Sequence, residues 1–567
     1  MKKNLLAASL ALALGSMSGV ASAALEVNTN GVGQINVLPY YSVQDSYNTL
    51  MTITNTDEVN GKVVKVRFRA AEWSDDALDF QIFLSPADVW TGAFGIVDGK
   101  LVLKTSDKSC TLPAALDGQE FTTIRVEGGN VDSLKEGYVE IITMADIPPK
   151  LNGADPTDAG NTANPLFTAV KHVNGIAPCG ATVAGLVENS TRIARPGTVA
   201  DDATAVVAAA ANAQGSWMLP PSSSLTSSAT VIAVNDSKAF TVPGTAITGL
   251  LADFPQVQYF RQSNTSFTFA NNAAADLLTA DRLFWPQQTA DQEGAAYPVY
   301  QFDLPDLSTP FAPAGSAVAR RNLIAQLLQK STLATDYVIA PSIQASTDIV
   351  LSQPVRRYFY TYTEVADPAV AGVDYNRTIR GEKFDVAGEV GTPYHALTIG
   401  NKVEVGAPTF WDREEQTFVS ADDIVVSPQE PGEAAKYFLE GEVSVVSIKN
   451  GEGATGALGA SLTNVDWSFA QSYTSGWAKL NTVAQGIDPA DLVAPYDVAG
   501  TALPLIGFTA INIFNAGAGA AGTNYGQVLP LRVSGLSRIQ CESGGLRPAG
   551  ACKDKGGLAR LCCFCRL

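Results

Sequence analysis

The clearest hydrophobic pattern in the chain has a period of two, which predicts β-strands. Between Lys62 and Arg69 apolar side chains alternate with basic ones, and Phe80, Ile82 and Leu84 repeat the pattern. Because a period of two puts alternate side chains on opposite faces of a sheet, we expect Lys62–Arg69 to be half-buried, with its charged face in solvent. The residues Tyr47–Thr54 and Tyr138–Met144 have the composition of neighbouring strands. Strands this short and this closely spaced predict a mainly β fold of antiparallel β-sandwich domains with a few short helices.

Turns and later segments extend this pattern. Asp98-Gly99 separates two short apolar runs and predicts a tight hairpin. Ala317–Gln329 has Ala and Leu at helical spacing and predicts one helix. Further strands are expected in the second half of the chain, at Ala229–Val234, Ile349–Tyr362, Thr417–Val426, Glu442–Ile448 and Ile506–Phe514.

The N-terminus has the three parts of a bacterial signal peptide. Lys2 and Lys3 precede an apolar run of about ten residues, which is too short to span a bilayer. The triplet Ala21-Ser22-Ala23 follows, so we expect cleavage between Ala23 and Ala24. No later stretch resembles a transmembrane helix. We therefore expect an exported chain at the cell surface or outside the cell, with the periplasm as the alternative.

The remaining chain divides into three predicted parts. With about 540 residues it exceeds what one hydrophobic core usually serves. We expect an N-terminal β-sandwich domain at 24–185, a larger β-rich domain at 186–531 and a Cys-rich basic tail at 532–567.

Composition narrows the possible partners. Only 17% of the residues are charged and the net charge is −18, which argues against nucleic acid and anionic membranes as partners. Partners are instead expected to be copies of the chain itself or other surface proteins. Cys110 and Cys179 are the only cysteines before the tail, and an oxidising compartment would favour a disulfide between them. Two free buried thiols are the alternative.

The sequence is poor in groups that could perform catalysis. Its two histidines, His172 and His395, form no zinc motif, and nothing local places either in a Ser-His-Asp triad. The best carboxylate cluster is Asp412, Glu414 and Glu415, beside a Trp411 that could stack on a sugar. Acids this close in sequence more often form a solvated loop or a salt-bridged turn. We assign no catalytic, cofactor-binding or metal-binding residue.

No cofactor is expected either. Acidic pairs such as Asp201-Asp202 and Asp422-Asp423 could supply oxygen ligands to calcium, but no EF-hand loop contains them, so the signal for calcium is weak.

The tail after Leu531 has a different character. Basic residues outnumber acidic ones there, and five of the seven cysteines lie within it. One interpretation is a Cys-rich metal or disulfide knob, although Cys562-Cys563-Phe564-Cys565 lacks the paired spacing of a zinc site. We favour the other interpretation, a shifted reading frame or foreign sequence that is disordered and has no strand pattern.

One set of segments comprises Asn36–Tyr41, Asn48–Leu50, Ile53–Thr56, Val64–Phe68, Leu84–Trp90, Thr347–Val350 with Pro354, Arg356 and Arg357, Trp411–Glu415 and Gly476–Ala478. These segments resemble a family of bacterial exported proteins labelled "cell surface protein". The resemblance covers most of residues 31–530. It implies export and a surface location, and it implies no enzymatic activity.

We therefore expect a non-catalytic exported structural protein of the cell surface or extracellular space that self-assembles. An adhesin or carbohydrate-binding protein is the alternative, and a secreted glycoside hydrolase is a third. Assembly could use the stretch Ala24–Tyr41 as a strand donated to a neighbouring copy, or the same stretch could pair within its own domain.

Overall fold

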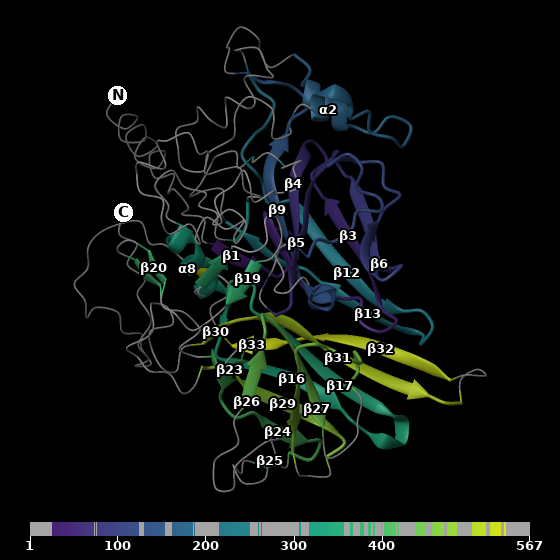
Figure 1. The fold of residues 1–567 in the computed structure, drawn as a ribbon, viewed down its shortest axis with the longest axis vertical. Helices are drawn as coiled ribbons and strands as arrows, with labels where there is room; N and C mark the ends of the chain where they lie inside the picture. Colours follow the sequence, from purple (N-terminus) through teal and green to yellow (C-terminus); the bar gives the residue numbers. More distant parts are fainter. Residues whose placement is uncertain are drawn as a thin grey trace, which may run out of the picture.

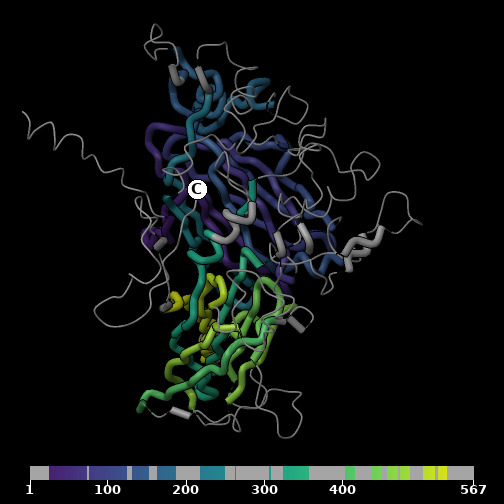
Figure 2. The backbone as a smooth tube through the Cα atoms, turned by 90° about the vertical axis from the view of Figure 1, so that its left-hand side faces the viewer, coloured from purple at the N-terminus to yellow at the C-terminus, as the bar shows by residue number. Residues whose placement is uncertain are grey.

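The computed structural model describes two β-sandwiches. It covers residues 25–72, 74, 76–123, 130–153, 162–184, 186, 215–249, 259, 262, 305–307, 317–356, 363–366, 375–378, 384–386, 389–391, 398–399, 402–415, 417–418, 437–449, 456–469, 473–484, 502–517, 522–534 and 538–539. Strands dominate these residues, and the predicted mainly β fold is confirmed. The two sandwiches lie end to end along the long axis of the molecule (Figures 1 and 2).

The first sandwich pairs an eight-stranded sheet with a five-stranded one. The larger sheet has the order β34 (Arg538–Ile539), β1 (Leu25–Asn28), β14 (Thr245–Thr248), β2 (Ile35–Ser42), β9 (Glu136–Ile147), β4 (Gly61–Ala70), β5 (Asp76–Leu84), β8 (Cys110–Leu112). The smaller has the order β13 (Lys238–Pro243), β12 (Leu225–Ala233), β3 (Asn48–Asn55), β6 (Val89–Val97), β7 (Lys100–Lys104).

Aromatic side chains fill the space between these two sheets. Phe68 from the larger sheet meets Phe94 from the smaller at 5.0 Å between ring centroids, edge to face, and Phe80 meets Trp90 at 5.7 Å. The predicted hairpin is present, because Asp98 and Gly99 both have positive φ between β6 and β7. The apolar side chains of the alternating strands thus face the core, as the period of two predicted.

The second sandwich pairs two five-stranded sheets. One has the order β25 (Thr417–Phe418), β24 (Thr409–Asp412), β29 (Ser475–Asn481), β16 (Thr332–Val338), β33 (Arg532–Ser534). The other has the order β28 (Asn464–Ser468), β27 (Val443–Lys449), β17 (Ala345–Ser352), β31 (Ile506–Asn515), β32 (Thr523–Pro530). All of these pairs are antiparallel except β27 with β28.

Shorter elements surround the sandwiches. The paired strands are β10 (Asn152–Gly153) with β11 (Gly215–Ser216), β15 (Gln329–Lys330) with β30 (Leu503–Pro504), β18 (Thr363–Ala366) with β19 (Tyr375–Thr378), β20 (Phe384–Val386) with β21 (Glu389–Gly391), and β22 (Thr398–Ile399) with β23 (Lys402–Val405) and β26 (Tyr437–Glu440). The described helices are α2 (Pro165–Val170), α3 (Gly180–Ala184) and α8 (Ala317–Leu328), with 3-10 turns η2 (Val131–Leu134) and η4 (Pro341–Ile343).

One continuous apolar core runs through both sandwiches. Tyr40 on β2 packs against Phe508 on β31, with 6.2 Å between ring centroids. The backbone carbonyl of Ala71, just after β4, accepts from the amides of Glu442 and Val443. Because apolar contacts and backbone hydrogen bonds both cross the junction, the two sandwiches form one packed unit.

The predicted boundary at residue 185 does not match sheet membership. The strands β12, β13 and β14 come later in the chain yet belong to the first sandwich, where β12 pairs with β3 over eight residues and β14 lies between β1 and β2. Position in the chain did not decide the partner, because strands far apart in the sequence can pair as well as neighbouring ones, and β12 and β14 each lie between two other strands.

The predicted tail also begins too early. Arg532–Ser534 pairs with β16, and Arg538–Ile539 pairs with Leu25 and Glu26 of β1. These first tail residues are therefore strands, contrary to the expectation of no strand structure. The five tail cysteines lie beyond the described residues.

The N-terminal stretch pairs within its own chain. Val27 on β1 lies opposite Ile247 on β14, and Ile35 on β2 lies opposite Ile142 on β9. Of the two arrangements considered for Ala24–Tyr41, the structure has the intramolecular one.

The charged face of β4 is buried, contrary to our expectation that it meets solvent. Lys65, Arg67 and Arg69 are all fully buried. Lys65 pairs with Asp79, and Arg69 contacts Glu140 at 3.3 Å. A later part of the chain covers this face, because Gln262 contacts Lys65 and Asp306 contacts Arg69. Acidic and amide groups from β5, β9 and the covering segment compensate the buried cations.

Candidate functional site

Among the described residues, two tryptophans form an aromatic pair on the outer face of the second sandwich. Trp411 on β24 lies directly opposite Trp477 on β29. Their indole rings stack with centroids 3.9 Å apart and planes 2° from parallel. Trp477 is 38% exposed, although Trp side chains are normally mostly buried. Trp411 is half-buried beside it.

Charged groups surround this pair on the same face. Asp336 on β16 lies opposite Trp477, and its carboxylate meets the Arg532 guanidinium at 3.4 Å. Lys479 lies two residues beyond Trp477 on β29, so it projects from the same side. The result is a flat exposed surface with an aromatic centre and both donors and acceptors of hydrogen bonds. Sequence reasoning identified Trp411 but missed Trp477, because only the strand register brings them together.

The carboxylate cluster beside Trp411 forms a solvated turn. Arg413, Glu414 and Glu415 are all exposed, and the Glu414 amide donates to the Asp412 side chain over 2.8 Å. Glu415 adopts a positive φ of 65° at the end of the turn. Two acids that flank a glycosidic bond need to face each other across a substrate-sized gap, whereas Glu414 and Glu415 are adjacent in one exposed turn.

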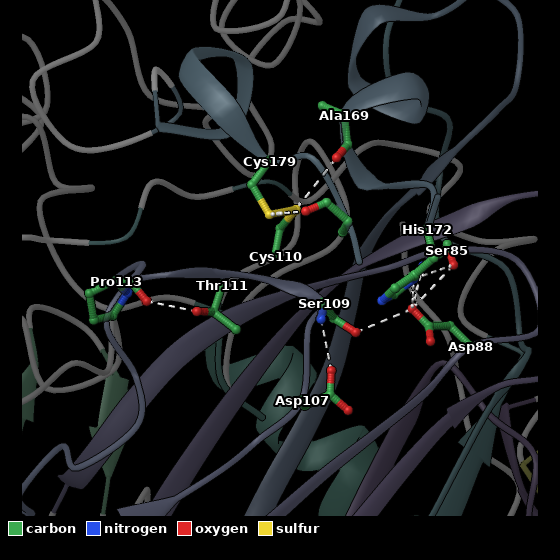
Figure 3. Close-up of a disulfide and its surroundings, with 11 residues drawn as sticks. Ser85, Asp88, Asp107, Ser109, Cys110, Thr111, Pro113, Ala169, His172 and Cys179 are labelled. Carbon is green, nitrogen blue, oxygen red and sulfur yellow. Dashed lines mark hydrogen bonds and ion pairs between the residues drawn. A yellow bond between two sulfur atoms is a disulfide. The ribbon is translucent and has the colours of Figure 1, made fainter. Parts of the chain in front are cut away.

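Within the described residues, a Ser-His-Asp trio comes together at His172. Its Nδ1 lies 3.1 Å from Ser85 Oγ and 3.4 Å from Asp88 Oδ2 (Figure 3). A catalytic triad needs the serine on one ring nitrogen and the aspartate on the other, so that the proton moves through the ring. Here both contacts fall on the same nitrogen. Asp88 also accepts from Ser109 Oγ and from the Ser85 amide, which makes it the centre of a local polar cluster. His395 lies outside the described residues.

The predicted cysteine pair lies beside this cluster. Cys110 on β8 and Cys179, just before α3, form a disulfide with 5.5 Å between Cα atoms (Figure 3). It ties the edge of the larger sheet to the segment that carries α2 and α3. A second, smaller apolar core lies under that segment and includes Leu166, Val170 and Trp217. The disulfide therefore anchors a cover over the outer face of the sheet.

Carboxylates with raised pKa values lie at the junction of the sandwiches. Glu136 on β9 is fully buried and accepts from Tyr40 Oη at 2.7 Å, Ser461 Oγ at 2.8 Å and the Leu462 amide at 2.9 Å. Burial raises its pKa to about 7, although these three hydrogen bonds act in the opposite direction. Asp45 adds a smaller upward shift.

A second buried acid holds the same loop from the other side. Asp348 on β17 accepts from the Leu458 amide at 2.7 Å, and burial raises its pKa to about 6. Asp45 accepts from the Ala460 amide at 3.3 Å. The loop between β27 and β28 is thus held by acids from both sandwiches. Sequence reasoning missed these acids, because nothing in the local pattern distinguishes a buried carboxylate from an exposed one.

Neither a metal cluster nor a membrane-spanning helix occurs in the part of the chain that the structure describes. No three His, Cys, Asp or Glu side chains gather there in a way that could hold a metal ion. Among the same residues, no helix has the length and apolar character to cross a membrane. The pairs Asp201-Asp202 and Asp422-Asp423 and the cleavage position Ala23/Ala24 lie outside the described residues.

Comparisons with known protein families, with curated proteins and with solved structures found no match. The resemblance to the exported cell-surface family therefore stays a prediction.

Proposed function

We propose that this chain is a non-catalytic, exported structural protein of the cell surface or extracellular space. The observation that supports the proposal is that its buried and clustered polar groups make structural contacts within the chain. Glu136 of the first sandwich and Asp348 of the second both hold the loop between β27 and β28. His172, just after α2, contacts Ser85 and Asp88 between β5 and β6. A disulfide between Cys110 and Cys179 suits an oxidising compartment outside the cytoplasm.

The test is export of the full chain from a bacterial host. We expect the exported protein to begin at Ala24, to carry the disulfide and to be cut by protease added to whole cells. A matched variant, Leu10→Arg, places a charge in the apolar run and should leave the protein in the cytoplasm, while Leu10→Ile should be exported normally. Full-length cytoplasmic protein that starts at Met1, with both thiols free in the wild type, would overturn the proposal.

One observation favours a second candidate function, carbohydrate binding at Trp411 and Trp477. The apolar face of a pyranose ring stacks on exposed indole rings, as apolar C–H groups do on aromatic surfaces generally. The neighbouring Asp336, Arg532 and Lys479 could hydrogen-bond sugar hydroxyls.

Affinity electrophoresis through gels that contain defined polysaccharides tests this candidate. We expect retardation of the wild type, its loss in Trp477→Ala and partial retention in Trp477→Phe. The control Tyr525→Ala removes another exposed aromatic, on β32, and should migrate as the wild type does. Equal mobility of the wild type with and without every polysaccharide would exclude the candidate.

A further inference from the structure

The outer face of the five-stranded sheet in the first sandwich carries no charge across four strands. Alternation along each strand identifies the side chains that point away from the core. We call them the uncharged face: Ala239, Thr241 and Pro243 on β13, Thr226, Ser228, Thr230 and Ile232 on β12, Asn48, Leu50, Thr52 and Thr54 on β3, and Val89, Thr91, Ala93, Gly95 and Val97 on β6.

In a sandwich with no partner, charged side chains are expected on the exposed face and uncharged ones in the interior, and here the two are exchanged. In the opposite sheet, Lys65, Arg67 and Arg69 are buried, whereas Leu50 on the uncharged face is 45% exposed and Val89 is also exposed. The surface of a soluble domain normally has roughly a quarter to a third of its positions charged. All of these outward positions except Gly95 are exposed or half-buried, and a set this large without a charge marks a contact surface.

We propose that the uncharged face is a self-association surface that packs against the same face of a second copy of this chain. Two copies carry a net charge of −18 each, so they repel unless contact is made where charge is missing. The same patch on both copies is complementary to itself when its side chains are small, β-branched and neutral. Charged residues lie at its rim, such as Lys104 on β7 and Lys238 on β13, as is usual around an interface core.

Other occupants fit this face less well. It has no aromatic side chain on which a sugar could stack, unlike the face with Trp411 and Trp477. It has no cation to bind a phosphate or an acidic peptide. Flat, β-branched sheet faces do pack on one another in sandwiches, at a spacing of about 10 Å.

The dimensions of the face predict a weak association. Strand β3 has eight residues, which span about 27 Å, and four strands cover about 19 Å in the other direction. The contact would therefore bury roughly 1,000 Å² in total from the two copies, at the lower limit for a specific interface. We expect a concentration-dependent dimer with a dissociation constant in the micromolar range or above.

Sedimentation velocity over a series of protein concentrations tests the proposal on the full chain. Leu50→Lys and Thr230→Glu each place a charge near the centre of the face, and each change occurs twice in a dimer. We expect either to raise the dissociation constant at least about tenfold. The control Val173→Lys adds the same charge at another exposed site, 60% exposed in a turn, and should sediment as the wild type does. Thermal melts check that all variants are folded, and Leu50→Met should retain the dimer if Leu50→Lys is not folded.

Two results would overturn the proposal: a wild type that stays monomeric at millimolar concentration, or a dimer that neither Leu50→Lys nor Thr230→Glu weakens. Self-association at the uncharged face would be one way in which the proposed surface protein assembles, so its biological meaning rests on the proposed function. The experiments can nevertheless contradict one proposal without the other. A monomer that protease reaches on whole cells would remove the association surface and leave the proposed function, whereas a dimer retained in the cytoplasm would do the reverse.

Discussion

Replacement of Glu136 by Gln should remove a large part of the pH dependence of stability. In the folded protein the pKa of Glu136 is about 7, against an ordinary value of 4.5. The folded state therefore holds a proton more tightly than the unfolded state does. The resulting stability is fully present below pH 4.5 and is lost as the pH rises through 7. A shift of this size corresponds to about 3 kcal/mol.

Gln preserves the shape and can still accept from the Leu462 amide while its amide group faces Tyr40, so the junction should remain packed. Urea denaturation at pH 4.5, 6 and 7.5 gives the free energy of unfolding of both proteins. We expect the difference between wild type and variant to change by about 3 kcal/mol across this range, with the wild type favoured at low pH. The contribution of Asp348 to the free energy of unfolding also falls as the pH rises, but it falls equally in both proteins.

The matched control is Glu120→Gln, at an exposed glutamate that pairs with Lys100. It should follow the wild type at every pH to within a few tenths of a kcal/mol. Parallel pH curves for wild type and Glu136→Gln would refute the reasoning, because they would show that the Glu136 carboxyl binds its proton equally in the folded and unfolded states.

Three further predictions concern stability. Lys62 is fully buried between Asp57 and Asp146, so Lys62→Met should lower the free energy of unfolding by about 3–5 kcal/mol in urea melts, and an unchanged midpoint would contradict this. Reduction of the disulfide, whose cysteines are 69 residues apart, should remove up to about 4 kcal/mol, measured as the urea midpoint with and without reductant. A chain that ends at Leu531 should melt several degrees below one that ends at Gln540, because it loses β33 and β34, and equal melting temperatures would show that these strands contribute nothing.

Local patterns predicted local structure well. The alternation at Lys62–Arg69 became β4, the Asp98-Gly99 pair became a hairpin turn, and Ala317–Gln329 became α8 with a boundary one residue away. Each of these depends on neighbouring residues alone. The Cys110–Cys179 pairing was also predictable, because only two cysteines precede the tail.

Features that depend on distant segments could not be predicted. Alternation showed that Lys65 and Arg67 share a face, but not that Gln262 and Asp306 would reach that face and exclude water. Likewise, Trp411 and Trp477 meet only because β24 pairs with β29 in one particular register. Glu136 also meets Ser461 and Leu462 of the second sandwich only in the assembled fold. The candidate surfaces are therefore properties of the assembled sheets, whereas the strands themselves are properties of the sequence.

The position of β14 has a consequence for synthesis. A ribosome releases β1 and β2 early, yet the strand that lies between them ends at Thr248, about two hundred residues later. At roughly 5–20 residues per second, Ile35 would wait on the order of 10–40 s for its neighbour Ile247. During that time no strand fills the place between β1 and β2, and such long-range pairing forms slowly in any case. The nascent chain therefore stays incompletely folded long enough for a membrane channel or a chaperone to act on it. A fragment that ends before residue 245 would leave β1 without β14 and β34 and would leave one edge of β2 unpaired.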